Sequence, residues 1–194
     1  DTSNTDNYYI KNLSPFIKQT YENNEIADTP WKEFAAGYMW GTTGFVYNPE
    51  EVDEEDVQSW NAFTNAKYAK KITAKNNIRD SYFTGLAMHY DAELRDLKAQ
   101  YEAGSLSYLE YQNILKQMMN DTSPETMNAV KTKLMSMTRN LYGFETDEGK
   151  NDTIAGKIWV NYQWSGDAVY IMDTAEYGEE EESENFESLI LNYA

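Results

Sequence analysis

The stretch GYMWGTTGFVYNPEEV, residues 37–52, combines aromatic and β-favouring residues with two glycines and two threonines. It predicts one short strand at 36–40 and another at 45–47, separated by Gly-Thr-Thr-Gly. Asn48-Pro49 then ends the run. Gly41 and Gly44 have two interpretations: they allow a close approach of main chains where a strand enters a domain, or they form an ordinary turn between the two strands.

Outward from this stretch, strand patterns alternate with helical ones. Strands are predicted at 71–74 and 158–164, and the apolar end of the chain, FESLILNYA, also has strand composition. EEVDEEDV, residues 50–57, is predicted to be an acidic loop, and the charged run 176–187 is predicted to be a solvated loop. SWNAF, residues 59–63, is predicted to form a short capped helix. This alternation predicts an α/β fold with one open sheet.

Apolar residues at helical spacing predict the longer helices. In residues 78–90 they recur at Ile78, Tyr82, Phe83, Leu86 and Tyr90, which predicts one buried face. Similar patterns predict helices over 108–119 and 125–137, and Ser14-Pro15 begins a shorter one over 13–21. A further helix follows the strand at 158–164, with Ser165 as its N-cap.

The overall charge narrows the classes of partner. Sixteen Lys and Arg stand against 33 Asp and Glu, for a formal net charge of -17. This charge excludes a nucleic-acid backbone as partner and allows a cationic one. The chain has no cysteine, so it offers no disulfide, thiolate metal site or cysteine nucleophile. No apolar run reaches the roughly 20 residues of a membrane-spanning helix.

Catalytic and metal-binding patterns are not present. The single histidine, His89, lies within a predicted helix, and no Gly-x-Ser-x-Gly motif occurs. The acidic residues 50–56 lack the spacing and central glycine of a calcium loop. The sequence therefore predicts no enzyme activity, no metal and no cofactor.

Two predicted strand-to-helix junctions carry the candidate ligand-binding residues. They are NNIRDSY, residues 76–82, and QWSGDA, residues 163–168, and ligands usually bind at such junctions in open α/β sheets. Asn77 and Asp80 offer an acceptor and a negative charge, and Trp164 offers an aromatic face. Together they suit an organic ammonium group. The alternative is that Asn77 only caps the helix and Asp80 is only a first-turn acid.

Four segments in order carry a resemblance to a known family: GYMWGTTGFVYNPEEV, SWNAF, KNNIRDSYFTGLAM and GKIWVNYQWSGDAVYIMDTAE. Together they resemble the spermidine/putrescine-binding protein of bacterial ABC transporters, over residues 36–176. The resemblance implies a periplasmic-binding-protein-like lobe, with a central mixed sheet flanked by helices. It also implies a hinged, two-lobed receptor that closes over a polyamine and delivers it to a membrane permease.

The resemblance also implies a division of the chain. Residues 1–35 would be an N-terminal segment with a short helix leading into the hinge region, and 36–194 the second lobe. The first lobe and a C-terminal part of the receptor would then lie outside this chain. The implied location is periplasmic or extracellular, with membrane association through an anchor or permease that is not in this chain.

Individual positions match the family's ligand-binding motifs. Asp80 takes the place of an acid that binds an amine of the ligand, and Trp164 that of an aromatic wall against its methylene chain. Where the family usually has Asp, this chain has Asn77. This change keeps an acceptor oxygen and removes one negative charge. Two alternatives remain: the same fold with a different small solute, and a carboxylate-based hydrolase with Trp164 as a sugar platform.

Overall fold

The structure is a computed structural model that describes residues 11–37, 39–178 and 189–194. It divides into two compact units, Asp1–Trp40 and Gly41–Ala194. In the first unit, α2 (Pro15–Asn23) begins with Pro15 after Ser14, whose Oγ accepts the Ile17 N–H at 3.2 Å. This helix confirms the one predicted at 13–21 and its start signal.

The rest of the first unit is short irregular structure after α2. It contains the hairpin of β1 (Glu25–Ile26) and β2 (Thr29–Pro30), followed by the turn η1 (Trp31–Glu33). The strand predicted at 36–40 is wrong for the described residues of that range, which lie outside strands. Strand-favouring residues form a strand only when a neighbouring strand takes up their main-chain groups, and none pairs with these.

The second unit is built on a five-stranded mixed sheet in the order β5-β4-β6-β3-β7. Its strands are β3 (Thr43–Tyr47), β4 (Ile72–Lys75), β5 (Gly143–Glu145), β6 (Val160–Trp164) and β7 (Asn192–Tyr193). The strands β5, β4 and β6 are parallel, whereas β3 is antiparallel to both of its neighbours. This arrangement confirms the predicted α/β fold and its central mixed sheet.

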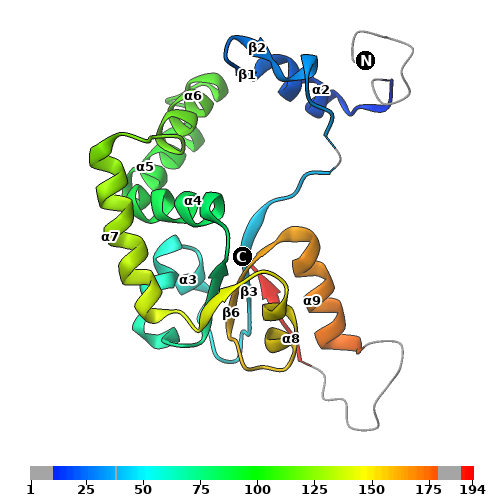
Figure 1. Cartoon of the computed structure of the whole chain (residues 1–194), viewed down its shortest axis with the longest axis vertical. Helices are drawn as coiled ribbons and strands as arrows, with labels where there is room; N and C mark the ends of the chain where they lie inside the picture. Colours follow the sequence, from blue (N-terminus) through cyan, green and yellow to red (C-terminus); the bar gives the residue numbers. More distant parts are fainter. Residues whose placement is uncertain (1–10, 38, 179–188) are drawn as a thin grey trace. The chain divides into compact units, whose positions relative to one another are not determined.

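Helices flank this sheet on both sides. The helices and turns are α3 (Glu54–Val57), η2 (Trp60–Thr64), η3 (Ala66–Tyr68), α4 (Ile78–His89), α5 (Asp91–Glu102), α6 (Tyr108–Met118), α7 (Pro124–Asn140), α8 (Glu148–Ile154) and α9 (Ser165–Tyr177). Figure 1 shows α4 and α7 on one side of the sheet and α8 and α9 on the other, with α5 and α6 leading away from the sheet. The predicted helices at 78–90, 108–119 and 125–137 are confirmed.

The strand β3 is buried on both of its faces. Phe45 and Tyr47 pack into a core beneath α4 and α7, which also contains Tyr162 and Met137. Val46 points the other way, into a smaller core that includes residues of α9. Burial on both faces explains why Phe45, Val46 and Tyr47 follow one another without a polar residue between them.

The glycines of the opening stretch permit close contacts. A β-carbon on Gly44 would clash with the main-chain oxygen of Ala194 and lie 2.9 Å from the Tyr193 ring. One on Gly41 would lie 2.8 Å from Ser165 Oγ. Since Gly44 lies within β3, the interpretation as a turn between two strands is wrong, and the close approach explains the residue.

Two local predictions need correction. Ile78 was predicted on the buried face of its helix and is 92% exposed, because it lies in the first turn of α4, beyond the end of β4. Ser165 is not an N-cap: Trp164 occupies that position, and Ser165 Oγ instead accepts the Thr42 N–H at 3.2 Å.

The prediction of an acidic loop over residues 50–57 is only partly correct. Residues 54–57 form α3, whose first turn is acidic, as the helix dipole favours. Most of the charged run 176–187 lies outside the described residues. At the chain end, residues 192–193 of the predicted C-terminal strand pair with β3 as β7.

Candidate ligand-binding site

The candidate residues lie at one edge of the sheet in the second unit. The strands β4 and β6 are parallel neighbours, with Thr73 opposite Asn161, so their carboxyl ends meet at the same edge. The helix α4 starts just after β4, and α9 starts directly after β6. The structure therefore brings the two predicted junctions together, on adjacent strands, where open α/β sheets bind ligands.

Asn77 and Asp80 lie at the start of α4. Asn77 is the N-cap, and its Oδ1 accepts the main-chain N–H of Arg79 at 2.8 Å and of Asp80 at 3.3 Å. Asp80 is half-buried in the first turn of the helix. Within residues 11–37, 39–178 and 189–194, no ion pair includes Asp80, so its carboxylate has no cationic partner there.

Trp164 ends β6 and is 43% exposed. Side chains alternate along a strand, so Trp164 lies on the same face as Tyr162, the face that α4 covers. The Tyr162 hydroxyl donates to Thr43 Oγ1 at 3.1 Å. Burial raises the pKa of Tyr162. Asp80 belongs to α4, which packs over this same face of the sheet. Asp80 and Trp164 therefore share one face of the sheet.

Two further aromatic side chains extend this face. The ring of Trp60 lies edge-on to Tyr162 at 5.5 Å between centroids and to Phe83 at 5.7 Å. Phe83 is 38% exposed and lies one helical turn after Asp80. Sequence reasoning assigned Phe83 to the core and Trp60 to a short helix. The spacing of Phe83 three residues after Asp80 was the signal that could have placed it beside the site.

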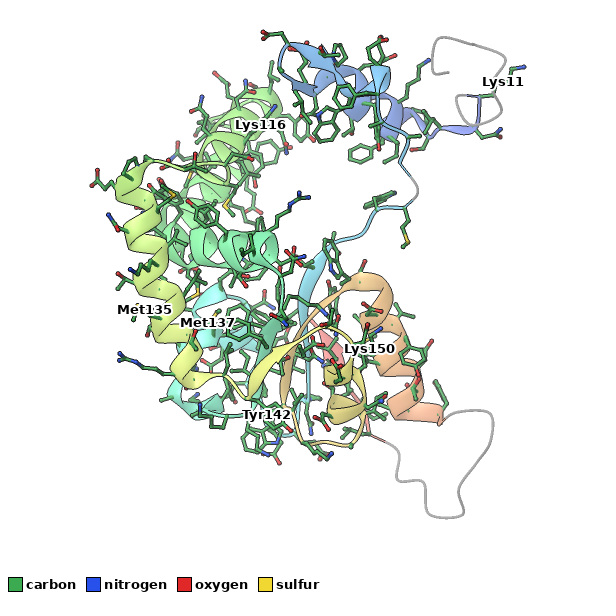
Figure 2. The ribbon with its side chains drawn as sticks, viewed as in Figure 1. Lys11, Lys116, Met135, Met137, Tyr142 and Lys150 are labelled. Carbon is green, nitrogen blue, oxygen red and sulfur yellow. The ribbon has the colours of Figure 1, made fainter. Side chains whose placement is uncertain are left out.

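Lysines neutralise other carboxylates at the same edge. Lys150, labelled in Figure 2, lies 2.8 Å from Asp167 and 3.2 Å from Asp147. The carboxylate of Asp167 raises the pKa of Lys150. Behind the edge, Lys75 pairs with Glu145 at 3.1 Å, and both side chains are buried. Burial raises the pKa of Glu145, although the nearby Lys75 acts in the opposite direction.

The described part of the chain holds no cluster of three or more histidines and acidic residues arranged to bind a metal ion. None of its helices is both long and apolar enough to cross a membrane.

A mixed sheet flanked by helices, with helix starts at the carboxyl ends of adjacent strands, has the architecture of a lobe of the periplasmic-binding-protein fold. Residues 4–170 match the family of bacterial extracellular solute-binding proteins, and the chain belongs to that family. This is a family of solute-binding proteins and not a class of enzymes. Its members are extracellular, which includes the periplasm.

Two solved structures are similar to this chain. One is the spermidine/putrescine ABC transporter substrate-binding protein PotD from Streptococcus pneumoniae, in complex with calcium and HEPES, with 23% identity and a TM-score of 0.58. The other is a putative spermidine/putrescine ABC transporter from Listeria monocytogenes, with 22% identity and a TM-score of 0.57. These matches confirm the resemblance found in the sequence, at the level of the fold.

The matches cover 85% of this chain, but only 41% of the first structure and 39% of the second. This chain therefore spans less than half the length of these solved proteins. No curated protein sequence matches it.

Proposed function

We propose that this chain is the second lobe of a two-lobed receptor that binds a polyamine, putrescine or spermidine, and delivers it to the permease of an ABC transporter. The observation that carries this proposal is the Asp80 carboxylate, which forms no ion pair among the described residues, on the same face as Trp164. Both similar structures bear names of spermidine/putrescine transport, which supports the same ligand class.

A polyamine carries ammonium groups separated by apolar methylenes, and the site offers a partner for each. Asp80 would bind one ammonium through a charge-assisted hydrogen bond. Trp164 would lie along the methylenes and add a cation–π contact of about 0.5–2 kcal/mol. Asn77 would contribute a neutral amide next to Asp80, and its cap also holds the Asp80 main chain in place.

The matched structures are more than twice as long as this chain, which supports a receptor with a first lobe in addition to this one. A ligand in the cleft between two lobes contacts both, so this lobe alone would bind it weakly. The exposed Ile78, at the edge of the site, would then face the ligand or the other lobe. In this proposal an anchor or the permease keeps the receptor at the membrane.

The test is a calorimetric titration of the full-length protein that carries this chain, here called the receptor. Putrescine, spermidine and a neutral sugar are titrated into the wild type and the variants Asp80→Ala and Trp164→Leu. We expect both polyamines to bind and both variants to bind them more weakly. Asp173→Ala, which removes an exposed acid of α9, is the matched control for charge. Unchanged affinity in both site variants would contradict the site.

A different small solute is the second candidate, and Asn77 is the observation that favours it. The family's Asp at this position would add a second negative charge, and Asn does not. Binding of the sugar alone in the same titration would replace the polyamine proposal with this one. The carboxylate-based hydrolase gains no support, because Glu145 and Asp167 are each paired with a lysine.

A further inference from the structure

Three polar side chains meet inside the second unit at the carboxyl ends of three adjacent strands. They are Lys75 of β4, Glu145 of β5 and Gln163 of β6, which are 6%, 7% and 0% exposed. Lys75 Nζ donates to Glu145 Oε1 at 3.1 Å and also to Gln163 Oε1. Gln163 Nε2 donates to Glu145 Oε1 at 3.2 Å. This set is called the buried triad below.

The three residues of the buried triad also form hydrogen bonds close to the candidate site, Gln163 through its side chain and Lys75 and Glu145 through their main-chain oxygens. Gln163 Oε1 accepts the Trp164 N–H at 3.3 Å. The main-chain oxygen of Lys75 accepts the Ser81 hydroxyl at 3.2 Å, and that of Glu145 accepts the Asn76 N–H at 2.9 Å. Through Gln163, the side-chain bond from Lys75 therefore connects the Trp164 main chain to the end of β4, from which the chain enters α4.

The main chain that follows Trp164 is fixed by hydrogen bonds to Thr42, which directly precedes β3. The Ser165 N–H donates to the Thr42 main-chain oxygen at 2.8 Å, and Ser165 Oγ accepts the Thr42 N–H. Because side chains alternate along β6, Gln163 lies on the face opposite the Trp164 ring. Gln163 therefore fixes the Trp164 N–H from the opposite face of β6. The hydrogen bonds between Ser165 and Thr42 fix the main chain directly after Trp164.

An interior ion pair adds little stability compared with well-packed apolar side chains of the same size, because both charges lose their hydration. Such a pair does impose one arrangement on the groups that it joins. Precise placement of binding groups depends on supporting hydrogen bonds behind them. The buried triad has this form, since its side chains join the ends of the strands that lead to Asp80 and Trp164.

We infer that Lys75, Glu145 and Gln163 are positioning residues, which orient Trp164 relative to the start of α4 and so determine how well the site fits its ligand. The expected effect of these residues on ligand binding rests on the proposed function. Its structural part concerns the ligand-free protein and can be tested separately.

The first experiment measures the position of the Trp164 ring without ligand. The receptor is labelled with 5-fluorotryptophan, and the ¹⁹F resonance of Trp164 is assigned from its loss in Trp164→Phe. The test variant is Gln163→Met, which removes the acceptor of the Trp164 N–H and leaves the Lys75–Glu145 ion pair. We expect the Trp164 resonance to shift or broaden.

The matched control is Thr73→Val. It removes another buried hydrogen bond between β4 and β6, which the Thr73 hydroxyl donates to Asn161 Oδ1 at 3.0 Å and which does not involve Gln163. We expect this variant to leave the Trp164 resonance in place. An unchanged resonance in Gln163→Met, or equal shifts in both variants, would overturn the inference whether or not polyamines bind.

The second experiment measures affinity for the polyamine that the wild type binds. Gln163→Met should weaken binding by roughly 2- to 10-fold, which corresponds to one hydrogen bond. In Trp164→Leu the same change should have no further effect, because Gln163 acts through Trp164. Equal losses in both backgrounds would overturn the inference. If the wild type binds no polyamine while the ¹⁹F shift is seen, the proposed function fails and the positioning role stands.

Discussion

Phe45 and Ala194 exchange two main-chain hydrogen bonds, of 2.8 Å and 2.9 Å. These bonds continue the pairing of β3 and β7 to the last residue of the chain. The neighbour of Phe45, Gly44, therefore lies directly against the main chain of residue 194. The glycine at this position is a consequence of tertiary pairing between residues 150 positions apart.

We predict that Gly44→Ala lowers the free energy of unfolding by about 1–3 kcal/mol, the usual cost of overpacking. The added methyl group would displace Ala194 and Tyr193 from β3. Urea unfolding followed by circular dichroism measures the change. The control is Gly143→Ala in β5, where an added β-carbon meets nothing within 4 Å. Equal stability of the two variants would contradict the close packing of β7.

A similar contrast tests how closely α4 and α7 pack. A β-carbon on Gly85 would lie 2.5 Å from Val130 Cγ1 and 3.2 Å from Leu134 Cγ. We predict that Gly85→Ala destabilises the protein, although alanine favours a helix over glycine by about 1 kcal/mol. Gly166→Ala in the first turn of α9 meets no neighbour and should not lower stability in the same urea experiment. A stabilising Gly85→Ala would mean that the two helices are further apart.

The carboxylate of Asp121 makes the stability of the protein depend on pH. Hydrogen bonds from the Thr126 hydroxyl, the Ser123 N–H and the Tyr90 hydroxyl hold the pKa of Asp121 well below its ordinary value of 3.8. A lowered pKa contributes stability that is present above the unfolded-state pKa and is lost as the pH falls below it. Asp121→Asn should therefore lower the midpoint of urea unfolding at pH 7. The difference in midpoint between this variant and the wild type should be smaller at pH 3.

Thermal or urea unfolding at both pH values measures this effect. The control is Asp173→Asn, on the exposed side of α9, which should leave the midpoint unchanged at pH 7. A difference between wild type and Asp121→Asn that is as large at pH 3 as at pH 7 would exclude the carboxylate charge as its cause.

Asn77→Asp tests the proposed site by adding charge. Asp is as good an N-cap as Asn, so α4 should keep its start. The second carboxylate beside Asp80 should tighten polyamine binding by about fivefold, through a charge-assisted hydrogen bond in place of a neutral one. Calorimetric titration of the receptor with spermidine measures the change. Unchanged or weaker binding would remove Asn77 from the proposed site.

Asn77→Ala is the matched variant for this test, because it removes the cap and adds no charge. It should destabilise the start of α4 by about 0.5–2 kcal/mol. A loss of affinity in Asn77→Ala together with a gain in Asn77→Asp separates the effect of charge from that of helix structure.

The sequence by itself determined the elements whose signals are local. Apolar spacing and a start signal are contained in 10 to 15 consecutive residues, so the helices at 78–90 and 125–137 were predictable. The class of fold followed from the alternation of strands and helices. The family resemblance and the candidates Asn77, Asp80 and Trp164 followed from short ordered motifs at the ends of predicted strands.

Local signals were insufficient where an element has little apolar surface. The helix α5 was not predicted, because Leu97 is its one buried residue and most of its other residues are exposed. The seven-residue α8 was also missed, since it is held by buried polar contacts such as Asn161 Nδ2 to Thr153 Oγ1 at 2.7 Å. In α5 the helical spacing is limited to Leu94, Leu97 and Tyr101, and α8 is too short to show a period.

Only the tertiary structure decided which distant residues meet. The order of the strands placed Lys75, Glu145 and Gln163 together, although 70 and 88 residues separate the first from the other two. It also placed Trp60 beside Tyr162, left Ile78 exposed and bonded Ser165 to Thr42. The physical reason is that such contacts depend on strand pairing and on which faces are covered, and no short segment of sequence contains that information.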